Sequence, residues 1–166
     1  MEKSPLMLTF ADLPPQELKN LLDPYGICIK IVENTTNIPG SFWGDSEAGL
    51  ILNNLYLRPE TPVHSALHEA CHYICLDSQR RYKLDTNAGG DYDEENAVCY
   101  LQILLSSKLS VCTADTLMQN MDEWGYSFRL GSASAWFHRD AEDAQQWLLA
   151  EKLIDQDNAP TGQLRQ

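Results

Sequence analysis

The stretch TPVHSALHEACHYICL, residues 61–76, decides the fold. Thr61 followed by Pro62 is typical of a helix start, with Thr as the N-cap and Pro at the first helical position. We expect this helix to run to about residue 76 or 77. It contains His68-Glu69-Ala70-Cys71-His72, an H-E-x-x-H pattern. Because residues four apart lie on one face of a helix, both imidazoles can reach a single tetrahedral metal ion.

Glu69 lies about 100° round the helix from His68. Its carboxylate is therefore expected beside the metal rather than on it, where it could take a proton from bound water. The alternative is that the two histidines and the acid are surface residues. However, the same stripe holds Leu67, Cys71 and Cys75, and burying two imidazoles there without partners would be costly. Metal binding is therefore the favoured interpretation.

A catalytic zinc site needs a third protein ligand and an open position. No third histidine follows at a short spacing, so the candidates are Glu94 and Glu95. On a helical wheel of the helix expected from residue 94 to about 107, Glu94 lies near the centre of the apolar face. Glu95 lies about 100° away, towards Gln102. A carboxylate in a buried face is costly unless a cation sits there, which favours Glu94. The alternative is that both are N-terminal acids that stabilise the helix dipole.

Two segments beyond the first helix extend the pattern. After a loop come Glu94-Glu95-Asn96-Ala97-Val98-Cys99-Tyr100 and then Leu104-Leu105. With these segments the chain resembles, over about residues 42–106, the ImmA/IrrE-type metallopeptidases, small zincins of the gluzincin class. The resemblance implies a zincin-like fold in which His68, His72 and Glu94 hold zinc and Glu69 is the general base. It also implies that the strand expected within residues 49–57 can pair with an extended substrate.

The remaining patterns predict an α+β fold, in which a small antiparallel or mixed sheet packs against the active-site helix and several further helices. Asp93 is expected to cap the helix that begins at Glu94. Helices are expected over about 14–22, 113–124 and 140–154, strands over 27–32, 41–43 and 49–57, and a loop over 78–92. We expect residues 1–155 to form a single domain and residues 156–166 to form a flexible tail.

The charge balance excludes some classes of partner. The chain has 166 residues, with 12 Lys and Arg against 24 Asp and Glu, a formal net charge of −12. This argues against nucleic acid, which needs clustered basic residues, and against an anionic membrane surface. We expect no signal peptide and no membrane span. The five cysteines are an odd set without disulfide spacing, which indicates free thiols and a cytoplasmic location.

Several other residues are secondary candidates. His64 could be a spare ligand or an outer contact of the site, although a solvent-exposed residue at the helix start is the favoured interpretation. Cys71 is interpreted as a small packing residue rather than a ligand. Tyr126 and His138 could stabilise an oxyanion, and Trp124 is expected in the core. Three acids could orient a ligand histidine: Asp77, Asp91 and Asp93.

These observations predict a zinc-dependent metallopeptidase that hydrolyses peptide bonds in a peptide or protein substrate. Water activated by zinc would attack the carbonyl, with Glu69 as the general base. The alternative is a non-catalytic zinc-binding regulatory or protein-interaction module. A fourth protein ligand that closes the site, for which His64 and Cys71 are candidates, would favour that alternative. A metal-free helical interaction domain is a third hypothesis.

Overall fold

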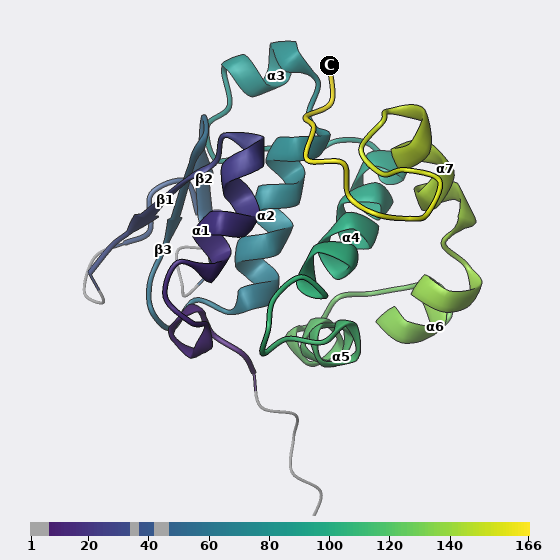
Figure 1. Ribbon diagram of the computed structural model, residues 1–166, viewed down its shortest axis with the longest axis horizontal. Helices are drawn as coiled ribbons and strands as arrows, with labels where there is room; N and C mark the ends of the chain where they lie inside the picture. Colours follow the sequence, from purple (N-terminus) through teal and green to yellow (C-terminus); the bar gives the residue numbers. More distant parts are fainter. Residues whose placement is uncertain (1–6, 34–36, 42–46) are drawn as a thin grey trace, which may run out of the picture.

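The computed structural model describes residues 7–33, 37–41 and 47–166. As expected, this part of the chain is α+β: seven α-helices accompany a three-stranded sheet (Figure 1). In chain order the elements are α1 (Glu17–Leu22), β1 (Cys28–Ile31), β2 (Gly49–Ile51), β3 (Asn54–Leu57), α2 (Val63–Cys75), α3 (Ser78–Tyr82), α4 (Tyr92–Ser106), α5 (Ala114–Trp124), α6 (Ala133–Arg139) and α7 (Glu142–Ala150), with 3-10 turns at Phe10–Asp12 and Asp23–Tyr25.

The sheet is mixed and has the strand order β1-β3-β2. The central strand β3 pairs in parallel with β1 and antiparallel with β2. The extended stretch expected over residues 49–57 is therefore two strands, joined by a tight turn in which Leu52 has a φ of 52°. Asn53 fixes this turn, because its side-chain amide donates to the carbonyl of Gly26 at 3.0 Å. Leu55 and Leu57 of β3 are fully buried and form part of the core beneath α2.

Helix α2 lies between the sheet and α4 (Figure 1). It begins at Val63, one residue later than expected, with Pro62 as the flanking residue. The hydroxyl of Thr61 does not cap the helix but accepts from the amide of Arg58 at 2.8 Å. Eleven of its thirteen residues are buried, so α2 carries its H-E-x-x-H pattern through the centre of the molecule.

Helix α4 begins at Tyr92, two residues earlier than expected. The reason is that Asp91, not Asp93, is its N-cap: the Asp91 carboxylate accepts from the amide of Glu94 at 2.9 Å. Helix α4 packs against α2 on one side and against α7 on another (Figure 1). Most of its surface is therefore buried. A helix that is buried on several sides is not oriented by a single apolar face, so the helical wheel did not predict which face of α4 contacts α2.

The helices predicted over about 14–22 and 113–124 are confirmed by α1, which begins only at Glu17, and by α5. The loop expected over 78–92 contains the short helix α3. The last predicted helix, over 140–154, corresponds to the shorter α7, whereas α6, whose N-cap is Ser132, lies in a stretch where no helix was predicted. Of the strand expected at 41–43, Ser41 is not in a strand, and residues 42–43 lie outside the described residues. No helix in the described part of the chain is long and apolar enough to span a membrane.

The tail expected to be flexible is instead bound to the domain. A bridge between Ile154 and Pro160 closes the turn with which the tail begins. The amide of Arg165 donates to the carbonyl of Ile74 at 3.0 Å, and the carbonyl of Arg165 accepts from the guanidinium of Arg81 at 2.6 Å. The C-terminal segment thus returns to the end of α2 (Figure 1). The polar composition of this segment led to the prediction of a flexible tail. The sequence could not reveal its hydrogen-bond partners, because they lie about 80–90 residues away in the chain.

Candidate metal centre

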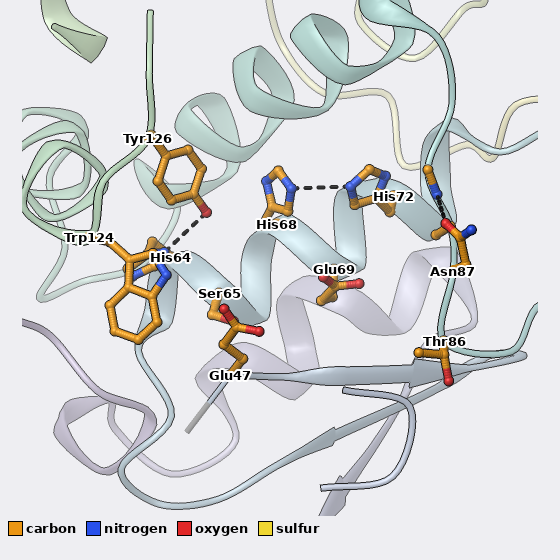
Figure 2. Close-up of a pocket in the computed structure, with 12 residues that line it drawn as sticks. Glu47, His64, Ser65, His68, Glu69, His72, Thr86, Asn87, Trp124 and Tyr126 are labelled. Atoms are coloured by element: carbon orange, nitrogen blue, oxygen red, sulfur yellow. Dashed lines mark hydrogen bonds between the residues drawn. The ribbon is translucent and has the colours of Figure 1, made fainter. Parts of the chain in front are cut away.

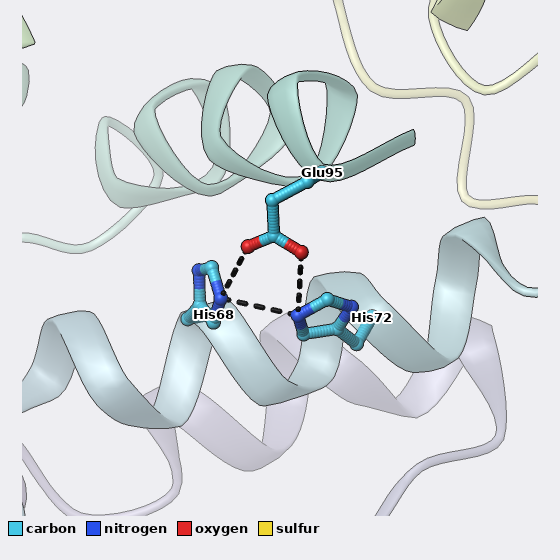
Figure 3. A group of neighbouring side chains, drawn as sticks. All are labelled: His68, His72 and Glu95. Atoms are coloured by element: carbon cyan, nitrogen blue, oxygen red, sulfur yellow. Dashed lines mark hydrogen bonds and ion pairs between the residues drawn. The ribbon is translucent and has the colours of Figure 1, made fainter. Parts of the chain in front are cut away.

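Three side chains from two helices converge at one point: His68 and His72 of α2 and Glu95 of α4 (Figure 3). The Nε2 atoms of the histidines are 3.1 Å apart. The Glu95 oxygens lie 3.1 Å from His68 Nε2 and 3.3 Å from His72 Nε2. Ligands at about 2.0–2.1 Å from a tetrahedral zinc ion lie about 3.3 Å from one another. Two imidazoles and a carboxylate at this spacing therefore fit a zinc ion.

The preference for Glu94 as the third member of this group is wrong. Glu94 is buried, as the helical wheel indicated, but its carboxylate binds two arginines. Arg80 of α3 contacts both carboxylate oxygens, and Arg165 of the C-terminal tail donates to Oε1 at 2.9 Å. Gly90 packs so closely that a Cβ there would lie 1.7 Å from Glu94 Oε2. The positive charges that compensate the buried Glu94 carboxylate are therefore the guanidinium groups of Arg80 and Arg165.

Gln102 of α4, which sequence reasoning missed, fixes the orientation of His68. Its side-chain amide nitrogen donates to the carbonyl of His64 at 2.8 Å. Because a carbonyl can only accept, the Gln102 oxygen must face His68, whose Nδ1 lies 2.9 Å away and must donate. Nδ1 therefore carries a proton, and Nε2 is the nitrogen that can bind a cation. Glu95 and Gln102 are seven residues apart on one face of α4, which was the signal available in the sequence.

The acids considered for this orienting role are used elsewhere. Asp77 caps α3 and binds the Arg80 guanidinium at 2.7 Å, and Asp91 caps α4. Asp93 is in the first turn of α4 and has no contact with either histidine among those described.

A cleft of about 310 Å³ lies along the side of α2 that carries the histidines (Figure 2). Its lining comes from α2, from the segment before β2, from the loop between α3 and α4, and from the end of α5. The lining residues are Glu47, His64, Ser65, His68, Glu69, His72, Thr86, Asn87, Ala88, Gly89, Trp124 and Tyr126. The loop expected over residues 78–92 thus supplies one wall of the cleft through residues 86–89.

Glu69 points into this cleft from α2 (Figure 2). Burial, together with the negative charges of Glu47 and Glu95, raises the pKa of Glu69 to about 7, although the charge of His68 opposes the shift. A carboxyl with a pKa near neutrality can both accept and release a proton under ordinary conditions. Its position beside the two histidines, and not between them, agrees with the expected role of Glu69.

The charges of the three converging groups depend on one another. Burial, and then the charge of His68, lowers the pKa of His72 to about 4. Burial also opposes the charged forms of His68 and Glu95. Contacts with Tyr126, Cys99 and Glu95 nevertheless raise the pKa of His68, and the two histidines lower the pKa of Glu95. Without a cation the cluster is an ion pair between His68 and Glu95, with His72 neutral, so binding a metal must release a proton.

His64 is 1% exposed, so the expectation that it contacts solvent is wrong. Burial and the nearby His68 lower the pKa of His64 to about 3, which keeps it neutral. Its Nδ1 lies 3.1 Å from the hydroxyl of Tyr126, which also accepts from Gln102 at 3.3 Å. Burial raises the pKa of Tyr126, so the hydroxyl stays protonated. When His64 Nδ1 is the donor in their hydrogen bond, the single hydroxyl proton can be donated into the cleft.

Two other candidates lie away from the cleft lining. His138 is in α6, where its ring packs edge-on against Phe137 at 5.1 Å, and it does not line the cleft. Cys71 is fully buried in the core, as expected for a packing residue. Among the residues that the structure describes, neither His64 nor Cys71 joins the cluster of His68, His72 and Glu95.

The edge of β2, where the resemblance places an extended substrate, is already paired with the chain itself. The carbonyl of Leu50 accepts from the amide of Thr86 at 2.9 Å, and the Leu50 amide donates to the carbonyl of Gly40 at 3.2 Å. Leu52 donates to Leu84 at 2.9 Å. In this structure the backbone next to the cleft is therefore the 86–89 segment and not β2.

Comparisons of the chain with protein-family models, with curated proteins and with solved structures found no match. The residues of the cleft and of the cluster beside it are therefore the basis for a functional proposal.

Proposed function

We propose that this protein is a zinc-dependent metallopeptidase with a zincin-like fold of the gluzincin type. The observation that carries the proposal is the convergence of His68, His72 and Glu95 beside a cleft that also holds Glu69. The first three side chains would hold the metal, and the cleft would hold a peptide or protein substrate. Zinc fits this donor set because it prefers imidazole and carboxylate ligands in a tetrahedral array.

When bound, zinc would supply Lewis-acid chemistry, by lowering the pKa of a water molecule and polarising a carbonyl. Glu69 accepts a proton from the water that attacks the peptide carbonyl and passes it to the amine that leaves when the C–N bond breaks. The Tyr126 hydroxyl, held by Gln102 and His64, donates to the oxygen that becomes negative in the transition state. Gln102 keeps the Nε2 of His68 turned towards the metal position.

A purely structural zinc site is less well supported. Such sites are closed by four protein ligands, whereas three ligands converge in the described part of this chain. A structural site also does not require a carboxyl group such as that of Glu69 next to the metal. Glu69 lines the cleft, and burial raises its pKa. The position of Glu69 therefore favours catalysis over a non-catalytic zinc-binding module.

Metal content and hydrolysis together test the proposed function. The purified protein should carry about one zinc ion per chain by elemental analysis, as expected for a three-ligand site. It should cleave members of a mixed peptide library, detected by mass spectrometry. A chelator should stop cleavage and added zinc should restore it. Protein that carries one zinc ion but cleaves neither the library nor unfolded protein substrates would contradict the proposal.

Gln102 provides a prediction about zinc affinity. Gln102→Met keeps the size of the side chain but removes the acceptor for His68, so zinc affinity should fall by about 10–100-fold. Competition with a chromophoric chelator measures this affinity. Gln145→Met is the matched control, because Gln145 binds Asn158 at 3.0 Å outside the cleft lining. Equal zinc affinity of the Gln102→Met variant and the wild type would rule out the orienting role.

A further inference from the structure

The end of the cleft near Trp124 is built differently from the end that holds the histidines. Trp124 was expected in the core, yet it is 41% exposed and its indole packs against the ring of His64 with the centroids 5.0 Å apart. Trp124 lines the cleft together with Tyr126, which is two residues further along the chain. An exposed indole face at the wall of a cleft is a favourable surface for a cation, because its quadrupole is negative above the ring.

Glu47 contributes a carboxylate to the same cleft (Figure 2). It comes just before β2, and the next residue fixes it to α2: the Ala48 amide donates to the Ser65 hydroxyl at 2.9 Å in a buried hydrogen bond. Ser65 itself lines the cleft between Glu47 and Trp124 in Figure 2. The backbone next to Glu47 is therefore anchored to α2 by a buried hydrogen bond.

The electrostatics of the cleft favour a positively charged guest. Among the described lining residues there is no Lys or Arg, whereas Glu47 and Glu69 both carry carboxyl groups. Both acids line the same cleft, Glu69 from α2 and Glu47 from the segment before β2 (Figure 2). His64, beneath Trp124, is neutral because it is buried. A cation beside Glu47 would relieve the repulsion between the acids.

We propose that Trp124 and Glu47 form a binding subsite for a Lys or Arg side chain of the substrate, so that the protein acts on basic peptides. The substrate cation would lie on the indole face and pair with the Glu47 carboxylate. This inference rests on the proposed peptidase function for its biological meaning, but the binding that it predicts does not require hydrolysis. The net charge of −12 acts in the same direction by attracting basic peptides over a longer range.

The test compares two capped peptides, acetyl-Ala-Ala-Arg-Ala-Ala-amide and the same peptide with citrulline, which has nearly the shape of Arg without its charge. Calorimetry with the zinc-loaded Glu69→Gln protein measures binding without cleavage. The Arg peptide should bind about tenfold more tightly, as expected for a cation–π contact combined with an ion pair. Glu47→Gln and Trp124→Leu should each reduce this preference to about threefold or less.

Glu123→Gln is the matched control, since Glu123 is an exposed acid next to Trp124 that does not line the cleft. It should leave the preference for Arg unchanged. Equal affinity for the two peptides, a preference that survives in Glu47→Gln, or no binding of either peptide at about 1 mM would each overturn the subsite. Library cleavage by the wild type without a preference for basic residues would remove the subsite and keep the peptidase. A preference for the Arg peptide in binding without any cleavage by the wild type would support the subsite and reject the peptidase function.

Discussion

Replacing Glu95 by Gln should abolish tight zinc binding and leave the fold intact. Replacing Glu94 by Gln should instead destabilise the fold and leave the zinc ligands in place. The Glu95 side chain is 44% exposed and contacts only the two histidines among the ion pairs of the described residues. Its loss removes one of three ligands, so zinc affinity should fall by more than about 100-fold, the upper range for changes in outer contacts. Chelator competition measures the affinity, and thermal melts of the metal-free protein measure the stability.

Glu94→Gln leaves Arg80 and Arg165 without their buried anionic partner. Each arginine is partly exposed and keeps a second acid, Asp77 or Glu151, so losing the charge-assisted hydrogen bonds to Glu94 should destabilise the protein by about 1.5–3 kcal/mol. Urea unfolding of the metal-free variant should show a loss of this size, while the remaining folded fraction should still bind zinc. The two variants are each other's controls, because they make the same chemical change at adjacent positions of α4. If Glu94→Gln lost zinc and Glu95→Gln kept it, the assignment of the third ligand would be reversed.

Glu69→Gln should reduce peptide hydrolysis by about 100- to 10,000-fold, the usual contribution of a general base. Zinc stoichiometry should stay near one per chain, because Glu69 is not part of the ligand cluster. Burial raises the pKa of Glu69 to about 7, which means that its ionised form costs stability at and above neutral pH. Neutral Gln removes this cost, so the variant should melt at the same temperature as the wild type or higher.

This combination of results separates catalysis from folding. A loss of hydrolysis with unchanged zinc content and a melting temperature that is equal to or higher than that of the wild type cannot come from unfolding or from loss of metal. Glu123→Gln removes an acid near the end of α5 outside the cleft lining and should hydrolyse peptides as the wild type does. A Glu69→Gln protein that cleaves the library at the wild-type rate would rule out Glu69 as the base.

The sequence was sufficient for features that depend on neighbouring residues in one element. The helix at residues 63–75 and the shared face of His68 and His72 follow from local signals, because a helix fixes the relative positions of residues four apart. The α+β class follows from strand patterns in the first part of the chain that are followed by a run of helix patterns. The expected burial of Glu94 was also correct, since the residues on the same face of the helix, Ala97, Val98 and Leu101, are apolar.

Tertiary structure decided which acid faces the histidines. A buried carboxylate needs a cation, and the sequence could not show that Arg80 and Arg165 supply it, because α3 was taken for loop and the tail for a flexible segment. With Glu94 turned to the arginines, the next residue, about 100° round the helix, faces α2. The position of Glu95 at the histidines is therefore a consequence of packing.

The cleft likewise depends on contacts between distant parts of the chain. Trp124 and Tyr126 reach it from the end of α5, Glu47 from the segment before β2, and residues 86–89 from the loop before α4. No spacing rule connects these segments to the H-E-x-x-H helix, since each is placed by its own packing. The sequence by itself determined two histidines and a glutamate on one helix. Only the tertiary structure determined their third partner and the cleft in front of them, because both depend on how α2 packs against α4 and the loops around it.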